Sequence, residues 1–240
     1  MVSLAPSNTE ILCALGSIDQ IVATTSLCDH PPSAVQKPSV GGWTRGTKVK
    51  EIEEMDPDIL LASDDLQDSL VDRLRDRSLE VRQFTPHTVD EVWESIMEIG
   101  ELIGRKDQAS ALVSDLKEVL GGFHLDGRIY CEEWMDPPMV SGNWIPGLLE
   151  NCGAEYFIEE GQRSREFSLK ELKDFDPEYI FLNVCGAGET VEPEKVGERD
   201  SWRDIEAVRE NRIYVVDDSL LNRPGPRLVE GVRKIESKME

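Results

Sequence analysis

Basic residues are scarce in this chain of 240 residues. It has 26 lysines and arginines against 48 aspartates and glutamates, which gives a formal net charge of −22. Nucleic acids and anionic membrane surfaces would repel such a chain, so both are disfavoured as partners. The hydrophobic fraction of 39% and the 18 glycines are nevertheless typical of a globular protein. We therefore expect the excess acid on the surface of an ordinary core.

Long apolar runs and paired cysteine motifs are also missing. No stretch approaches the roughly 18 apolar residues of a membrane span, and the first residues lack the basic and apolar regions of a signal peptide. The five cysteines are far apart, with no CxxC pair, which is typical of free thiols in a reducing compartment. As written, the sequence predicts a cytoplasmic location. The alternative is an extracytoplasmic location, if an export signal has been trimmed.

Short buried strands alternate with helices along most of the chain. Residues 59–62 and 179–182 read as buried strands, and residues 89–103 and 108–120 read as amphipathic helices separated by Gly104. A strand at 128–132 is followed by a predicted loop at 134–139 that contains a double proline. This alternation predicts an α/β fold with mostly parallel sheets.

The sequence also contains an internal repeat. Residues 49–61 and 169–181 align over their whole length, and each reads as a helix, an Asp-Pro stop and a buried strand. The offset of 120 residues is half the chain, which indicates two similar lobes. We expect an N-terminal α/β lobe at 1–87, bridging helices at 88–122 and a C-terminal α/β lobe at 123–240.

Motifs for catalysis or metal binding are weak. Cys28 and His30 could be half of a zinc site, but no matching pair lies nearby. The run Gly186–Gly188 lacks the third glycine of a dinucleotide fingerprint and reads as a loop. Acidic residues around Trp134 match no nucleophile–base arrangement. We therefore predict that the protein is not an enzyme and has no metal of its own.

Three tryptophans lie in or beside predicted loops. Trp43 follows two glycines, while Trp134 and Trp144 flank the double proline. Loop tryptophans of a two-lobed protein can line a cleft and stack on a planar ligand. Trp93, in the predicted helix at 89–103, and Trp202 are expected to be structural.

Four segments carry a resemblance to a known family. Residues 2–10, 28–32, 56–58 and 222–227 resemble the helical-backbone (class III) substrate-binding proteins of ABC importers, which take up cobalamin, ferric siderophores and haem. The spacing from Pro31-Pro32 to Trp43 and the run at 136–142 are most similar to the cobalamin-binding members.

The resemblance implies two Rossmann-like lobes with mostly parallel sheets, bridged by a long helix, with the ligand in the cleft between them. It also implies a monomer that binds its ligand without covalent chemistry, has no intrinsic cofactor and serves an ABC permease. Trp43 matches an aromatic residue that packs on the corrin ring. Leu27 and Met139 stand where the cobalamin binder has tyrosine and phenylalanine, and Ser219 replaces an aspartate. The predicted ligand-binding residues are Leu27, Trp43, Trp134, Met139, Trp144, Asp218, Ser219, Leu220 and Asn222.

Permease docking is where the chain departs most from the family. The resemblance implies one docking glutamate per lobe, yet Lys50 and Lys170 occupy those positions, with Glu51 and Glu171 next to them. One residue along a helix turns the side chain by about 100°. Either the docking geometry is shifted to the neighbouring glutamates or the protein has no permease partner.

The predicted function is therefore reversible binding of cobalamin or a related corrinoid or metal chelate, as part of an ABC-type uptake system. One alternative is a ferric siderophore or haem, for which Arg45, Arg163 and Arg165 are candidate contacts and His30 a candidate axial ligand. The other alternative is an intracellular cofactor carrier or enzyme without a permease.

Overall fold

The computed structural model describes residues 1–239, and these fall into two compact units. Unit 1 consists of Met1–Pro86 and Trp93–Ser114, and unit 2 consists of His87–Val92 and the chain from Asp115 onward. Among the described residues, no helix combines the length and the apolar character that crossing a membrane requires. Each unit contains its own sheet, so the predicted α/β fold with two sheets is confirmed.

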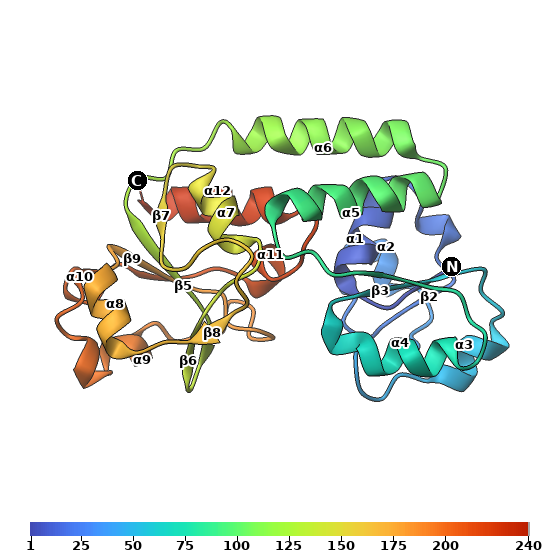
Figure 1. Cartoon of the computed structure of the whole chain (residues 1–240), viewed down its shortest axis with the longest axis horizontal. Helices are drawn as coiled ribbons and strands as arrows, with labels where there is room; N and C mark the ends of the chain where they lie inside the picture. The colour runs from blue at the N-terminus through green and yellow to red at the C-terminus, as the bar shows by residue number, and fades with distance from the viewer. Residues whose placement is uncertain (240) are drawn as a thin grey trace. The chain divides into compact units, whose positions relative to one another are not determined.

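The sheet of unit 1 has four parallel strands in the order β2-β1-β3-β4. The strands are β1 (Val2–Ser3), β2 (Ala23–Thr24), β3 (Leu60–Ser63) and β4 (Val81–Phe84). Figure 1 shows this sheet with α1 on one side and α3 and α4 on the other. These helices are α1 (Pro6–Ala14), α2 (Pro32–Val35), α3 (Val49–Glu54) and α4 (Asp68–Arg75), with short 3₁₀ turns at Ile18–Gln20 and Asp65–Gln67.

Buried aliphatic residues on both faces of this sheet form the core of unit 1. Val2, Leu4 and Leu60 in or beside the central strands are 0% exposed, and so are Ile52 of α3 and Leu74 of α4. All-parallel sheets are covered on both faces, which is why β3 reads as a continuous apolar run in the sequence.

The sheet of unit 2 repeats that arrangement and then extends it. Strands β7, β5, β9 and β10 pair in parallel in the same order as β2, β1, β3 and β4. Beyond β5, the strands β6 and β8 add antiparallel pairs at the edge. The strands are β5 (Arg128–Met135), β6 (Pro138–Val140), β7 (Glu155–Tyr156), β8 (Arg165–Glu166), β9 (Tyr179–Leu182) and β10 (Ile213–Val215).

Helices α7 to α12 and a 3₁₀ turn at Asp200–Trp202 accompany the sheet of unit 2. Figure 1 shows α12 and α7 near one another, while α8 and α10 lie towards the other side of this sheet. The helices are α7 (Ile145–Glu150), α8 (Leu169–Phe175), α9 (Glu194–Gly197), α10 (Glu206–Arg209), α11 (Asp218–Leu221) and α12 (Leu228–Met239). Leu228, Val232 and Ile235 make the buried face of α12, at the spacing expected for an amphipathic helix.

The predicted helix–Asp-Pro–strand repeat is present in both units. Helix α3 leads into β3, and α8 leads into β9. Asp56 and Asp176 follow these helices with φ of 44° and 46°, the left-handed conformation that ends a helix. Ser168 and Glu171 form a capping box at the start of α8.

The predicted loop at 134–139 is wrong. Strand β5 continues to Met135, and a tight turn leads into β6, where Trp134 pairs with Met139 and Met135 with Pro138. Sequence reasoning missed this hairpin because a double proline is typical of a loop. Pro137 lies in the turn, and Pro138 begins its strand, a position where a missing N–H is tolerated.

The predicted bridging segment contains two helices, α5 (Val89–Leu102) and α6 (Lys106–Leu120). Gly104, with φ of 69°, ends α5. Its N–H donates to the carbonyl of Glu101 at 3.2 Å, and the N–H of Arg105 donates to that of Gly100 at 2.6 Å. This pair of bonds is the glycine-dependent Schellman cap, which explains why the helical pattern is interrupted there.

Candidate ligand-binding site

The carboxyl ends of the strands of unit 1 meet at one edge of its sheet, where α/β proteins commonly bind ligands. The side chain of Gln67, 0% exposed, connects the segments that emerge there. Its Oε1 accepts from the N–H of Ser63 at 2.7 Å, while its Nε2 donates to the carbonyls of Leu4 at 2.9 Å and Trp43 at 2.7 Å. Gln67 therefore holds the Trp43 loop against the ends of β1 and β3.

The Trp43 loop is also fixed by its own backbone. A Cβ on Gly41 would lie 2.2 Å from the carbonyl oxygen of Gly46, and Gly41 has φ of 95°, so this position requires glycine. The carbonyl of Gly41 accepts from the N–H of Ser26 at 2.8 Å. This bond links the loop to the end of β2.

Apolar side chains are exposed along this edge. Leu27 is 50% exposed and Leu66 is 65% exposed, and Trp43 between their segments is half-buried. We call Leu27, Trp43 and Leu66 the apolar patch. Leu66 was missed by sequence reasoning, because a helix pattern does not show which residue of its first turn faces solvent.

The thiol of Cys28, in the segment beside the patch, is engaged within the protein. Cys28 is buried, and its Sγ lies 3.2 Å from the hydroxyl of Thr9 and 3.3 Å from that of Thr25. Within residues 1–239, no group of three histidine, cysteine or acidic side chains is arranged to hold a metal ion.

The corresponding edge of unit 2 carries amide and hydroxyl groups. Asn183 follows β9 and is 0% exposed; its Nδ2 donates to the hydroxyl of Ser141 at 3.0 Å and to Oδ1 of Asn222 at 2.6 Å. Nδ2 of Asn222 donates in turn to the carbonyl of Asn183 at 2.9 Å. This network joins the ends of β6, β9 and α11 in unit 2.

Several predicted ligand contacts in this unit are buried. Trp144 is 7% exposed, and its indole N–H donates to the carbonyl of Leu221 at 2.9 Å. Leu220 is 6% and Ser219 9% exposed. Trp134 and Met139 are more exposed than these residues. They pair across the β5–β6 hairpin, and Trp134 is 48% exposed.

Asp218 is engaged within the protein. Its two carboxylate oxygens accept from the N–H groups of Gly186 and Gly188, each at 2.9 Å. The run Gly186–Gly188 forms the loop that the sequence predicted.

A fully buried carboxylate lies next to this edge of unit 2. Glu132, 0% exposed, forms a bidentate pair with Arg199 at 2.7 and 2.8 Å and accepts from the hydroxyl of Tyr130 at 2.8 Å. Burial raises the pKa of Glu132, and Arg199 and Tyr130 oppose that shift. The Arg199 guanidinium also lies 4.4 Å from the ring centre of Trp202. This arrangement anchors the segment before Trp202 to β5, and both carboxylate oxygens of Glu132 accept hydrogen bonds within the protein.

The predicted docking residues occupy equivalent places. Lys50 and Lys170 are the second residues of α3 and α8, and both are exposed. Lys170 pairs with Asp174. Hydrogen bonds from Ser168 and the nearby Arg165 lower the pKa of Glu171.

Glu51 is less constrained than Glu171. It forms one exposed ion pair with Lys48 at 3.1 Å, whereas Glu171 accepts from Ser168 twice and from Arg165. Of the arginines predicted for an anionic ligand, Arg165 is therefore paired, and Arg45 and Arg163 are exposed.

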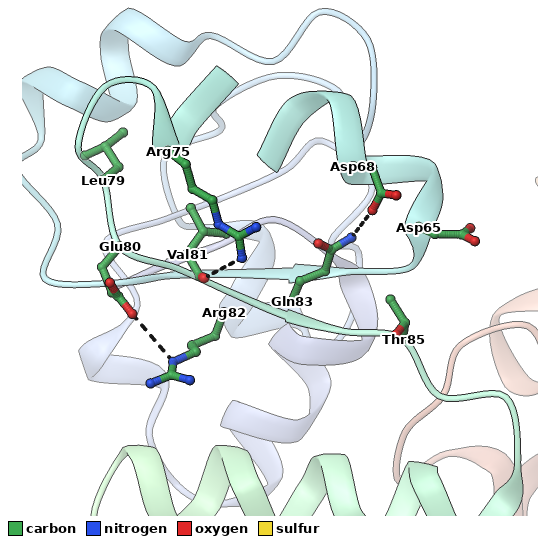
Figure 2. Close-up of a pocket in the computed structure, with 9 residues that line it drawn as sticks. All are labelled: Asp65, Asp68, Arg75, Leu79, Glu80, Val81, Arg82, Gln83 and Thr85. Carbon is green, nitrogen blue, oxygen red and sulfur yellow. Dashed lines mark hydrogen bonds and ion pairs between the residues drawn. The ribbon is translucent and has the colours of Figure 1, made fainter. Parts of the chain in front are cut away.

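A charged groove of about 760 Å³ lies along the edge strand β4 of unit 1. Figure 2 shows Arg75 bonded to the carbonyl of Val81, and Gln83 bonded to Asp68. Its lining residues are Asp65, Asp68, Arg75, Leu79, Glu80, Val81, Arg82, Gln83 and Thr85. The nine predicted ligand-binding residues do not line this groove, and its charged walls contrast with the apolar patch.

The model of the periplasmic binding protein family matches residues 1–120, half of the chain, so the chain belongs to this family. It is 28% identical over 98% of its length to an uncharacterized ABC transporter substrate-binding lipoprotein of Bacillus subtilis, covering 78% of that protein. It is 24% identical over 98% of its length to a cobalamin-binding protein of Halobacterium salinarum, covering 68% of that protein. The chain is thus a non-catalytic substrate-binding protein of the ABC-importer class.

Solved structures share the fold. A possible iron-binding protein from Staphylococcus epidermidis has a TM-score of 0.83 at 24% identity, with 99% of this chain and 96% of that chain covered. A periplasmic haem-binding protein of Vibrio cholerae has a TM-score of 0.81 at 17% identity, with 98% and 96% covered. At these identities the likeness extends to the fold and leaves the ligand open.

Proposed function

We propose that this protein binds cobalamin or a related corrinoid, reversibly and without covalent chemistry, and delivers it to an ABC permease. Relatives named as cobalamin- or vitamin B12-binding proteins align with 98% or more of the chain. The names of other relatives contain "lipoprotein" and "periplasmic", which supports the extracytoplasmic alternative for its location.

The observation that carries the proposal is the apolar patch. Large apolar side chains at 50% and 65% exposure, fixed at the carboxyl edge of a parallel sheet, are typical of a ligand-binding surface. A corrinoid presents a broad, partly apolar ring with amide groups at its periphery. Such a ligand suits apolar contacts from Leu27, Trp43 and Leu66.

Haem or a ferric siderophore is the second candidate, supported by the shared fold with iron- and haem-binding structures. Haem iron requires an axial ligand from the protein. The four tyrosines all lie within strands of unit 2, so His30 is the proposed axial donor. An intracellular carrier without a permease is the remaining alternative.

Titration with cyanocobalamin and with haem, followed by tryptophan fluorescence, tests the proposal. We expect saturable quenching by cyanocobalamin, and Trp43→Ala should weaken binding by about 10- to 100-fold because it removes a large apolar contact. His30→Ala should leave cobalamin binding unchanged and would weaken haem binding.

A matched pair of variants distinguishes a specific role of the apolar patch in binding from a general effect of exposed apolar side chains. Leu27 is 50% exposed at the carboxyl end of β2, and Val22 is 44% exposed at its amino end. Leu27→Ala should weaken cobalamin binding several-fold, on the order of one lost apolar contact, while Val22→Ala should not. Absence of quenching at micromolar ligand, or equal effects of both variants, would contradict the proposal.

Docking on the permease is proposed to use the glutamates beside the two lysines. Glu51 makes only an exposed ion pair with Lys48, which contributes little and is easily exchanged for a permease arginine. Glu171 is held by Ser168 and Arg165, so the docking contact of α8 would have to break or share these bonds.

A further inference from the structure

Gly186 and Gly188 form an unusual backbone feature after strand β9. Both have positive φ, 74° and 55°, with Ala187 between them. Their N–H groups converge on the carboxylate of Asp218, each at 2.9 Å. The N–H of Ala187 is used separately, in a turn to the carbonyl of Val184 at 3.0 Å.

Backbone N–H groups that converge in this way make an anion-binding concavity, called a nest. The two glycines are needed because the other residues rarely adopt positive φ. The bound anion is the protein's own side chain, since both oxygens of Asp218 occupy the nest. Charge-assisted bonds of this kind are stronger than neutral ones.

The nest lies where unit 2 carries its amide network. Asn222, one turn after Asp218, donates to the carbonyl of Asn183 at 2.9 Å and to the Sγ of Cys185 at 3.1 Å. The loop is therefore joined to the end of α11 through Asn222 as well as through Asp218.

We propose that Gly186–Gly188 is an anion-binding nest that Asp218 occupies, and that Asp218 thereby disfavours ligands that carry carboxylate groups at this edge of unit 2. This role in ligand choice rests on the proposed function, whereas the nest itself does not. A carboxylate ligand would have to displace Asp218 and would also meet its charge. An amide-bearing ligand meets neither cost.

The nest is tested with Asp218→Ala and free acetate as the probe. The variant should melt about 4–8 °C below the unmodified protein, because two charge-assisted bonds are lost. Acetate should then raise the melting temperature of the variant saturably, relative to sodium chloride at equal ionic strength, by filling the vacant nest. The unmodified protein should show no such difference between the two salts.

Asp217→Ala is the matched control. Asp217 is the neighbouring carboxylate and accepts from one N–H, that of Ser219, at 2.9 Å. Its removal leaves no converging pair, so acetate should not rescue this variant. Equal effects of acetate on all three proteins, or none on Asp218→Ala, would overturn the nest.

The role in ligand choice is tested separately. Asp218→Ala should bind haem, which has two carboxylates, at least several-fold more tightly than the unmodified protein does, so the ratio of haem affinity to cyanocobalamin affinity should rise. If acetate rescues the variant but the ratio of the two affinities does not move, the nest stands and its role in selectivity is refuted. If the unmodified protein binds neither ligand, the proposed function fails while the acetate result still decides the nest.

Discussion

Glu132 is a charged side chain with 0% exposure, and its burial depends on a single cationic partner, Arg199. Moving a carboxylate out of water costs several kcal/mol, and a bidentate arginine offsets that cost. Arg199 supplies this geometry and is itself packed against Trp202. Because Arg199 lies in the segment after α9, the ion pair connects that segment to the middle of the sheet.

Replacing Arg199 by methionine should therefore lower the free energy of unfolding by about 3–5 kcal/mol, because Glu132 is left buried without a cation. Burial already raises the pKa of Glu132, and the pKa should rise further without Arg199. The loss of stability should be smaller at about pH 5 than at about pH 8. With its pKa raised, Glu132 of the folded variant is protonated, and a chain that takes up a proton on folding becomes less stable as the pH rises. Urea unfolding at both values measures this.

The double variant Glu132→Gln, Arg199→Met is the control for this prediction. It removes the charge along with its partner, so it should recover much of the stability and lose the pH dependence. A loss that is equal at both pH values in the single variant would show that packing of Arg199 on Trp202, rather than the charge, is what matters.

At the scale of elements, α5 and α6 pack closely at one point. A Cβ built on Gly100 of α5 would lie 2.3 Å from the Cβ of Ala109 of α6, which is 0% exposed. Glycine within a helix costs about 1 kcal/mol relative to alanine. The close approach of the two helices explains why α5 nevertheless has a glycine there.

Gly100→Ala should consequently destabilise the protein by about 1–2 kcal/mol, because the clash outweighs the gain in helix propensity. Thermal unfolding of this variant and of Gly100→Ala, Ala109→Gly measures the effect. The second substitution exchanges the positions of the methyl group and should restore most of the lost stability. A stabilised single variant would mean that the helices separate at little cost.

Elements were predictable from the sequence wherever local chemistry decides them. The Asp-Pro repeat, the capping box at Ser168 and the glycine stop after α5 depend on residues a few positions apart, and the structure contains all three. The hairpin of β5 and β6 was missed because pairing partners, and not the prolines, decide whether Trp134 lies in a strand.

For the whole molecule, the charge of −22 predicts a dependence on salt. Self-repulsion among surface carboxylates destabilises a compact chain, and added ions screen it. The melting temperature should rise between about 0.05 M and about 1 M sodium chloride. Potassium chloride should act alike, because screening depends on ionic strength; a melting temperature that stays flat or falls would contradict the prediction.

The sequence by itself determined the α/β class and the helix–Asp-Pro–strand repeat, which follow from periodicity and short motifs that act over a few residues. The family followed from a resemblance in four short segments, and the ligand-binding role of Leu27 and Trp43 stays a prediction. Only the tertiary structure showed that Trp144 is buried, that Asp218 fills a nest, and that Gln67 and Arg199 hold segments in place. Gln67 and Leu4 are 63 residues apart, and Arg199 and Glu132 are 67 apart. Hydrogen bonds over such separations depend on how the chain folds back on itself, and a pattern in the sequence does not contain that information.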